Sequence, residues 1–203
     1  VELEIGGQKI DKHTGDWMET WAELTEPNPT GEVCDMDQLA RGGGTLFQSM
    51  SGMGGVDTIT GLTNGEVLTI PLQFWFCRNP GLALPLIALQ YHEVKVILDH
   101  TMGTNIGTTA TNKLWCDYIY LDTDERRRFA QVSHEYLIEQ VQEQSCTGLA
   151  TGADLNFNHP VKELVWHILP ASVEVASATL AGTWQLKLNG HDRFAARDFR
   201  YFT

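Results

Sequence analysis

Histidine is the residue type here best suited to metal binding, but its spacing argues against a metal site. The seven histidines are scattered along the chain, at His13, His92, His100, His134, His159, His167 and His191. No two of them form an H-x-H pair, and His134-Glu135 lacks the second histidine of the H-E-x-x-H zinc motif. We therefore predict no metal ligand among the histidines.

Other motifs that could carry catalysis are also missing from the sequence. The glycine clusters Gly42–Gly44 and Gly52–Gly55 are not followed by Lys-Ser or Lys-Thr, so neither is a phosphate-binding loop. No G-x-S-x-G nucleophile motif is present. Asp35 and Asp37 lie in a polar loop pattern, where solvation is the ordinary state of a carboxylate. We predict no catalytic, cofactor-binding or metal-binding residue, no cofactor, and no enzyme activity.

The four cysteines, Cys34, Cys77, Cys116 and Cys146, are too far apart for a C-x-x-C redox or metal motif. Cys77 and Cys116 lie inside apolar runs typical of strands, which predicts buried free thiols. This cysteine usage indicates a reducing compartment.

The charge balance excludes a phosphate-binding surface as the main feature of the protein. The formal net charge is -12, with only 14 lysines and arginines, and nucleic-acid affinity depends on such cations. The basic run Arg126–Arg128 directly follows three acidic residues, so we interpret it as a self-neutralised, solvated or interface segment. No apolar window is long enough to span a membrane, and no secretion leader opens the chain. The start at Val1, inside a strand pattern, predicts a fragment or processed product.

The residues that could organise the fold lie between Glu66 and Asp99. Apolar side chains alternate there along a predicted strand, at Leu68, Ile70, Leu72, Phe74 and Phe76. Asn79-Pro80-Gly81 predicts a turn, and a second alternation at Val94, Val96 and Leu98 predicts another strand.

Short strands dominate the rest of the pattern as well. We predict strands at 1–7, 115–121, 134–142, 163–168 and 184–188, a helix at 14–24, a helical turn capped by Asp122, a long loop at 26–65, and a linker at 145–158. This pattern favours an all-β fold, an antiparallel sandwich or jelly roll with short helices in its loops. The segment Trp184–Gly190 repeats the pattern of Val1–Gly7 at an offset of 183 residues, which suggests a duplicated sandwich.

Long runs of the sequence resemble the major capsid proteins of nucleocytoplasmic large DNA viruses, those of algal viruses in particular. The runs are LEIGGQKIDKHTGDWM, IPLQFWFCRNPGLALPLIALQYHEVKV, YIYLDTDERRRFAQVSHEYLIEQVQ, FNHPVKELVW and LNGHDRF, and together they cover most of the chain. The resemblance implies a tandem double jelly roll, with both rolls incomplete in this partial sequence. On that basis we expect a first roll lacking its opening strands at 1–144, a linker at 145–158, and the beginning of a second roll at 159–203.

The same resemblance implies a structural role in the virion. It predicts homotrimers that form pseudo-hexagonal capsomers of an icosahedral double-stranded DNA virus, with neighbouring capsomers and minor capsid proteins as partners. It implies no direct nucleic-acid contact, and an internal viral membrane nearby without insertion into it. The protein is expected in the capsid, and in the host cytoplasm during assembly. The alternative is a carbohydrate-binding jelly-roll module, which would expose a planar aromatic platform.

Overall fold

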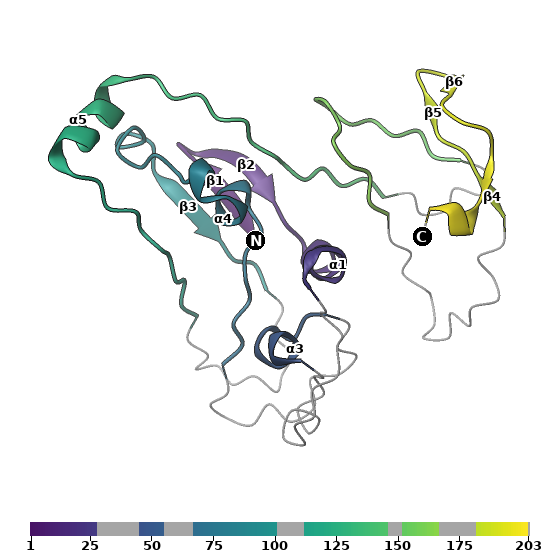
Figure 1. Cartoon of the computed structure of the whole chain (residues 1–203), viewed down its shortest axis with the longest axis horizontal. Coiled ribbons are helices and arrows are strands. Elements are labelled where there is room, and N and C mark those ends of the chain that lie inside the picture. Colours follow the sequence, from purple (N-terminus) through teal and green to yellow (C-terminus); the bar gives the residue numbers. More distant parts are fainter. Residues whose placement is uncertain (28–44, 55–66, 101–111, 146–151, 167–181, 203) are drawn as a thin grey trace. The chain divides into compact units, whose positions relative to one another are not determined.

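The computed structural model describes residues 1–27, 45–54, 67–100, 112–145, 152–166 and 182–202. The chain divides into two compact units, Val1–Asn158 and His159–Thr203. Both contain antiparallel strands; the described residues of the first unit also form several short helices, and those of the second form one 3-10 helix (Figure 1). Antiparallel pairing, predicted from the alternating pattern, is confirmed for every sheet in these residues.

The first unit is organised around a three-stranded sheet. Its strands are β1 (Glu2–Ile5), β2 (Gln8–Lys12) and β3 (Val94–Ile97), in the order β2-β1-β3. Leu3 on the central strand pairs with Asp11 of β2 and Val96 of β3. The strands predicted near residues 1–7 and 94–98 are therefore confirmed, and they are direct neighbours.

The turn between β1 and β2 depends on two glycines. Gly6 and Gly7 have φ angles of 61° and 78°, the left-handed conformation that a two-residue type I′ hairpin needs at both positions. The amide of Gly6 donates to Glu93 O at 2.9 Å. A Cβ atom on Gly6 would lie 2.7 Å from His92 Nδ1, so this close approach also requires glycine.

The core of the first unit lies against β1. Leu3, Phe74 and Trp75 are its buried members, with exposed fractions of 0%, 1% and 5%. Partly buried apolar side chains surround them, at Val1, Ile5, Ile10, Leu72, Phe76, Leu82, Leu84, Val94 and Val96. Residues of β1 and of the apolar run that starts at Leu68 therefore share one core.

The strand predicted over Leu68–Phe76 is wrong. Residues 67–74 have no strand pairing, and Trp75–Arg78 forms the one-turn helix α4, followed by the 3-10 helix η1 (Pro80–Leu82). In a strand, the consecutive residues Phe74 and Trp75 would point to opposite faces. The chain leaves the extended conformation at Phe74, and both rings are buried in one core. The turn predicted at 79–81 is confirmed, because Asn79 Oδ1 accepts from Gly81 N at 2.9 Å.

Two capped helices follow β2 in the chain. Helix α1 (Gly15–Thr25), predicted from its tryptophan spacing, begins after Thr14, whose side chain accepts from Trp17 N at 3.2 Å. Helix α3 (Leu46–Ser51) has a capping box between Thr45 and Gln48. This second helix corrects the prediction of an uninterrupted loop at 26–65, whose remaining parts at 28–44 and 55–66 lie outside the described residues.

Helix α5 (Thr123–Gln131) is capped by Asp122, as predicted, since the carboxylate accepts from Glu125 N at 2.8 Å. The strands predicted on either side of it, at 115–121 and 134–142, are wrong, because neither segment has strand pairing. Trp115 and Tyr120 are 85% and 92% exposed. An alternating pattern places the apolar side chains on one face of an extended segment. A β-strand also needs a second strand about 4.8 Å away with which its backbone can form hydrogen bonds.

The second unit contains two small antiparallel sheets. Strand β4 (Thr183–Trp184) pairs with β7 (Arg197–Asp198), β5 (Lys187–Leu188) pairs with β6 (His191–Asp192), and the 3-10 helix η2 covers Phe199–Tyr201. The predicted strand at 184–188 is confirmed in these two pieces. Residues 163–166 have no strand pairing, and His167 and Ile168 lie outside the described residues.

The β5–β6 turn has the same geometry as the β1–β2 turn, at the predicted offset. Asn189 and Gly190 have φ angles of 52° and 78°, and Leu188 pairs with His191 as Ile5 pairs with Gln8. The sequence repeat therefore coincides with a shared hairpin type. Leu3 belongs to the core of the first unit, while the repeated strand belongs to the second.

Candidate functional site

The most enclosed polar group of the described chain is a carboxylate–imidazole pair. Asp11 Oδ2 lies 3.0 Å from His13 Nε2, and both side chains are only 1% exposed. The two residues are two positions apart at the end of β2, so both point toward the core. The His13 ring stacks on Phe74, with ring centroids 4.6 Å apart and planes inclined by 24°.

The remaining atoms of this pair point to a structural role. Asp11 Oδ1 accepts from the backbone amides of Lys12 at 2.9 Å and Val141 at 3.1 Å, so the carboxylate ties a distant segment to β2. His13 Nδ1 is buried and has no hydrogen-bond partner. When Nε2–H donates to the carboxylate, Nδ1 of a neutral imidazole carries a lone pair that can accept a hydrogen bond. The pair is closed to solvent, which leaves no access for a substrate.

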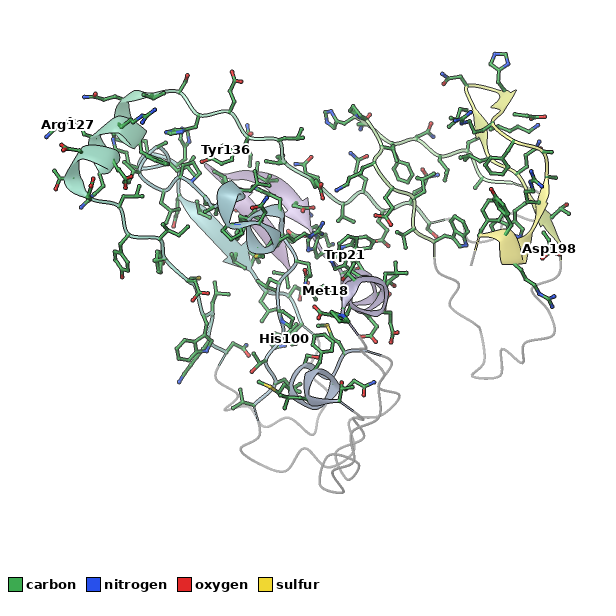
Figure 2. The ribbon with its side chains drawn as sticks, in the orientation of Figure 1. Met18, Trp21, His100, Arg127, Tyr136 and Asp198 are labelled. Carbon is green, nitrogen blue, oxygen red and sulfur yellow. The ribbon has the colours of Figure 1, made fainter. Side chains whose placement is uncertain are left out.

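Arg78 makes contacts with three parts of the first unit. Its guanidinium carbon lies 4.2 Å from the Trp21 ring centroid, its Nε donates to Gln73 O at 2.9 Å, and Nη1 lies 3.2 Å from Glu139 Oε2. Trp21 projects from α1 and Glu139 lies beyond α5 in the chain (Figure 2). This arrangement joins segments by charge and ring stacking, and presents no nucleophile.

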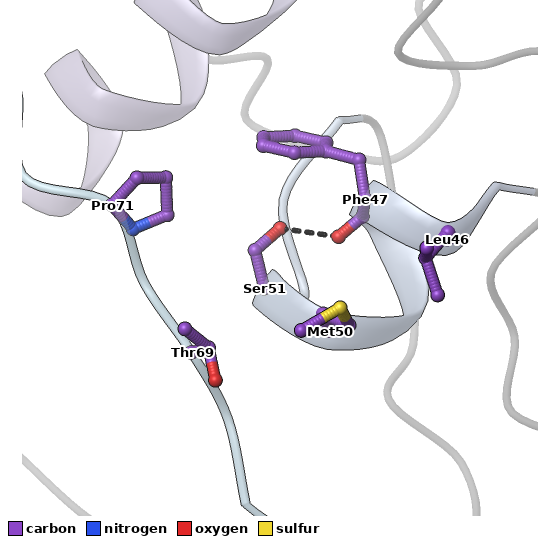
Figure 3. Close-up of a pocket in the computed structure, with 6 residues that line it drawn as sticks. All are labelled: Leu46, Phe47, Met50, Ser51, Thr69 and Pro71. Atoms are coloured by element: carbon purple, nitrogen blue, oxygen red, sulfur yellow. Dashed lines mark hydrogen bonds between the residues drawn. The ribbon is translucent and has the colours of Figure 1, made fainter.

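A hollow of about 350 Å³ lies between α3 and the segment that follows it. Its lining is formed by Leu46, Phe47, Met50, Ser51, Thr69 and Pro71 (Figure 3). The Ser51 hydroxyl donates to Phe47 O at 2.7 Å, so it is engaged within its own helix. None of these six described residues carries a charge, so they offer mainly apolar contact.

The cysteines differ from the sequence prediction. Cys77 and Cys116 are free thiols, as expected, but both are exposed and not buried. Cys77 lies in α4, and Cys116 in an unpaired segment, so the strand that would have buried them is not formed. Although the residue is exposed, neighbouring atoms partly desolvate the Cys77 thiol and raise its pKa, which lowers the fraction present as reactive thiolate.

Two other histidines, His134 and His100, have separate local partners. His134 Nε2 lies 2.7 Å from Phe129 O at the end of α5, and His100 Nε2 lies 3.1 Å from Asn112 Nδ2. Within the described ranges, no three His, Cys, Asp or Glu residues form a group that could hold a metal ion. None of the helices there is both long and apolar enough to cross a bilayer.

The glycines and carboxylates that were weighed as motifs give no site either. Gly52 has a φ angle of 67° and ends α3, which explains the glycine at that position. Asp35, Asp37 and Gly42–Gly44 lie outside the described residues.

The basic run lies on α5, which has no buried residue. Arg127 projects from the helix and its Nη1 lies 3.6 Å from Asp124 Oδ1 (Figure 2). Acidic residues occupy the first turn of α5 and arginine the last, the distribution that the helix dipole favours. The local structure is therefore compatible with a self-neutralised segment.

Asp11, His13 and Arg78 did not emerge from the sequence as functional or structural centres. The D-x-H spacing at Asp11 and His13 places both on one strand face, and this signal is present in the sequence. The contacts of Arg78 have no comparable signal, because Glu139 is 61 residues away.

The sequence matches two protein-family models, and these matches identify the family of the chain. Residues 1–122 match the model described as the major capsid protein N-terminus, and residues 125–203 match that of the large eukaryotic DNA virus major capsid protein. The chain belongs to the major capsid proteins of large eukaryotic DNA viruses. The resemblance stated from the sequence runs is therefore confirmed.

Individual relatives agree with this family. The chain is 50% identical to the major capsid protein of Pyramimonas orientalis virus, over 100% of this chain and 50% of that protein. It is 41% identical to that of Phaeocystis pouchetii virus, over 98% of this chain and 45% of the relative. The major capsid protein of Paramecium bursaria Chlorella virus 1 is 37% identical, over 100% of this chain and 55% of its own length. The chain thus spans about half the length of these curated relatives.

A solved structure is also similar in sequence. It is the crystal structure of PBCV-1 VP54 fitted into a cryo-EM reconstruction of the virophage Sputnik, 39% identical, with a TM-score of 0.39. The match covers 70% of this chain and 33% of that one.

Proposed function

We propose that this chain is part of a structural subunit that builds the icosahedral capsid of a large double-stranded DNA virus. The observation that carries the proposal is the pair of capsid family matches, which together take in residues 1–122 and 125–203. The structure adds support through its chemistry, because the buried Asp11–His13 pair and the Arg78 contacts join segments and present no substrate site.

The proposed architecture is a double jelly roll, with a first roll at 1–144, a linker at 145–158 and a second roll beginning at 159. Two observations support it. The chain separates into units at Asn158 and His159, and the two units contain type I′ hairpins at the 183-residue offset of the sequence repeat. The first unit has one three-stranded sheet and the second has two two-stranded sheets, which is compatible with partial copies of one sandwich fold.

The assembled form in this proposal is a homotrimer with a pseudo-hexagonal outline, in contact with neighbouring capsomers and minor capsid proteins. The subunit has no enzyme activity, requires no metal or cofactor, makes no direct contact with nucleic acid, and lies near an internal viral membrane without entering it. It is located in the virion, and in the host cytoplasm during assembly.

The aromatic residues of the second unit do not favour the carbohydrate-binding alternative. In the second unit Trp166 and Trp184 stack on each other, with ring centroids 6.0 Å apart and planes inclined by 15°. Each ring thus turns a face toward the other, while a sugar platform needs free faces aligned in one plane. Phe202 packs edge-on against Trp166 at 5.8 Å, as expected of an aromatic cluster.

Light scattering on the complete gene product tests the assembly. We expect a mass three times that of one subunit across a range of concentrations. A product that stays monomeric at high concentration would count against the proposal. Binding to a glycan array, with no association, would support the carbohydrate-binding module instead.

A further inference from the structure

Three alternate glutamines extend their side-chain amides to the backbone of other segments. They are Gln140, Gln142 and Gln144, in the run Gln-Val-Gln-Glu-Gln. Gln142 makes a two-way contact with one residue, because its Nε2 donates to Asn158 O at 3.1 Å and its Oε1 accepts from Asn158 N at 3.0 Å. A single side chain thus takes both backbone polar groups of Asn158.

Gln144 continues the same pattern two residues further along. Its Oε1 accepts from Asn156 N at 2.9 Å, and its Nε2 donates to Asp154 O at 2.6 Å. Position 142 therefore faces 158, and position 144 faces 156, which is an antiparallel register with a step of two residues on each side. Because a glutamine side chain lies between the two backbones, they are too far apart for a ladder, and neither segment is a strand.

In the other direction, the same register pairs position 140 with position 160, and this pair explains where the contacts stop. Gln140 would face Pro160, which has no amide hydrogen to donate. Gln140 Nε2 donates instead to Ile10 O of β2 at 2.6 Å. Val141 N donates to the buried carboxylate of Asp11 at 3.1 Å, so residues 140 and 141 are fixed to the sheet.

The chain changes direction immediately after the last contact. His159 has a φ angle of 69°, a left-handed conformation that is uncommon for a residue other than glycine and that departs from the extended form favoured before proline. The boundary between the two compact units falls between Asn158 and His159. The end of the amide contacts, the strained residue and the unit boundary therefore coincide.

We propose that residues 140–144 are a clamp that holds residues 154–158 in a fixed antiparallel register through side-chain amides and releases the chain at His159. Asp11 and Ile10 anchor the clamp to β2, and Gln142 and Gln144 hold the outgoing segment. The clamp gives residues 154–158 a defined course up to the unit boundary. This inference concerns the course of the chain and does not depend on assembly.

Amide hydrogen exchange at Asn156 and Asn158 in the full chain tests the clamp residue by residue. One net hydrogen bond corresponds to a change of about two- to tenfold in exchange rate. Gln142→Ala should accelerate exchange at Asn158 by this factor and leave Asn156 much less affected, and Gln144→Ala should do the reverse. Gln142→Glu keeps the acceptor oxygen and should restore most of the protection at Asn158.

Two controls keep the result unambiguous. Gln131→Ala, at the exposed end of α5, should change neither amide. The Leu3 amide in β1 serves as the reference for an intact sheet, and rates are expressed relative to it. Equal acceleration of Asn156 and Asn158 by either alanine variant, or no change in both, would overturn the proposed register.

Discussion

Arg78 lies over the ring of Trp21, with 4.2 Å between its guanidinium carbon and the ring centroid. This contact joins α4 to α1. The ion pair between Arg78 and Glu139 also connects α4 to the segment that follows α5. The side chain of Arg78 is 23% exposed, so its charge is partly desolvated. A planar guanidinium can stack on a ring and pair with a carboxylate at the same time, which an ammonium group does less well.

We therefore expect Arg78→Ala to lower the free energy of unfolding of the full chain by about 1–2 kcal/mol. Arg78→Lys should recover part of this loss, since it keeps the charge opposite Glu139. Denaturant unfolding measures both values. Arg127→Lys on exposed α5 is the matched control and should have almost no effect. If Arg78→Lys and Arg127→Lys behave alike, the ring contact has no energetic role.

The β1–β2 turn predicts a graded series of glycine substitutions. Gly6→Ala combines a positive φ angle with a contact to His92 and should cost about 1–2 kcal/mol or more. Gly7→Ala has the same backbone cost with open space around the new methyl group, so its effect should be smaller. Gly15→Ala, at the start of α1 and also in open space, should be neutral. Thermal unfolding should rank the three in this order, and a different order would argue against the turn geometry.

The buried pair predicts a larger effect at Asp11. Asp11→Ala removes the acceptor of both His13 Nε2 and Val141 N, and each buried donor left unpaired costs about 1–3 kcal/mol. We expect a total loss of about 2–4 kcal/mol in denaturant unfolding. Asp192→Ala removes a carboxylate from an exposed pair with Lys187 and should cost well under 1 kcal/mol, about the value of a surface ion pair. A loss at Asp11 no greater than at Asp192 would contradict the structural role of the pair.

Glu2 gives a prediction for pH. The hydrogen bond from Lys9 Nζ, at 2.6 Å, lowers the pKa of the Glu2 carboxyl below its usual value of 4.5. A lowered pKa in the folded state means that the contribution to stability is present above the unfolded pKa and is lost as pH falls through the folded one. Because the Lys9 side chain is 48% exposed and that of Glu2 is 27% exposed, solvent screens the pair and the effect on stability is small. Carboxyl NMR titration should show the shift, and Lys9→Met should return Glu2 toward its usual pKa.

Metal removal should have no consequence for this protein. The scattered histidines motivate the expectation, because none belongs to a spaced metal motif. Unfolding curves with and without a chelator should coincide, and elemental analysis of the purified protein should find no stoichiometric zinc, iron or manganese. One equivalent of such a metal, bound by histidine, would contradict the expectation.

Local signals in the sequence predicted the framework well. The cap at Asp122, the turn at 79–81 and the helix at 14–24 each depend on neighbouring residues, and each is confirmed. The predicted strands at 115–121 and 134–142 failed because pairing is not a local property. An apolar alternation cannot specify whether a neighbouring strand is present.

The buried pair was missed for a related reason. A regular hairpin with Ile5 opposite Gln8 would pair Leu3 with Ile10, but a bulge between Leu3 and Glu4 shifts the partner to Asp11. Beyond the bulge, the extra residue in β2 reverses which of its alternate side chains point to the core. The bulge thus brings Asp11 and His13 inward, and no feature of the sequence announced it.

The most direct test of the central proposal is electron microscopy of the complete gene product after purification without other viral proteins. We predict particles of three subunits with a pseudo-hexagonal outline, each subunit containing two sandwich domains. Discrete monomers, or particles whose subunits contain a single domain, would contradict the assignment of this chain to a double jelly-roll capsid subunit.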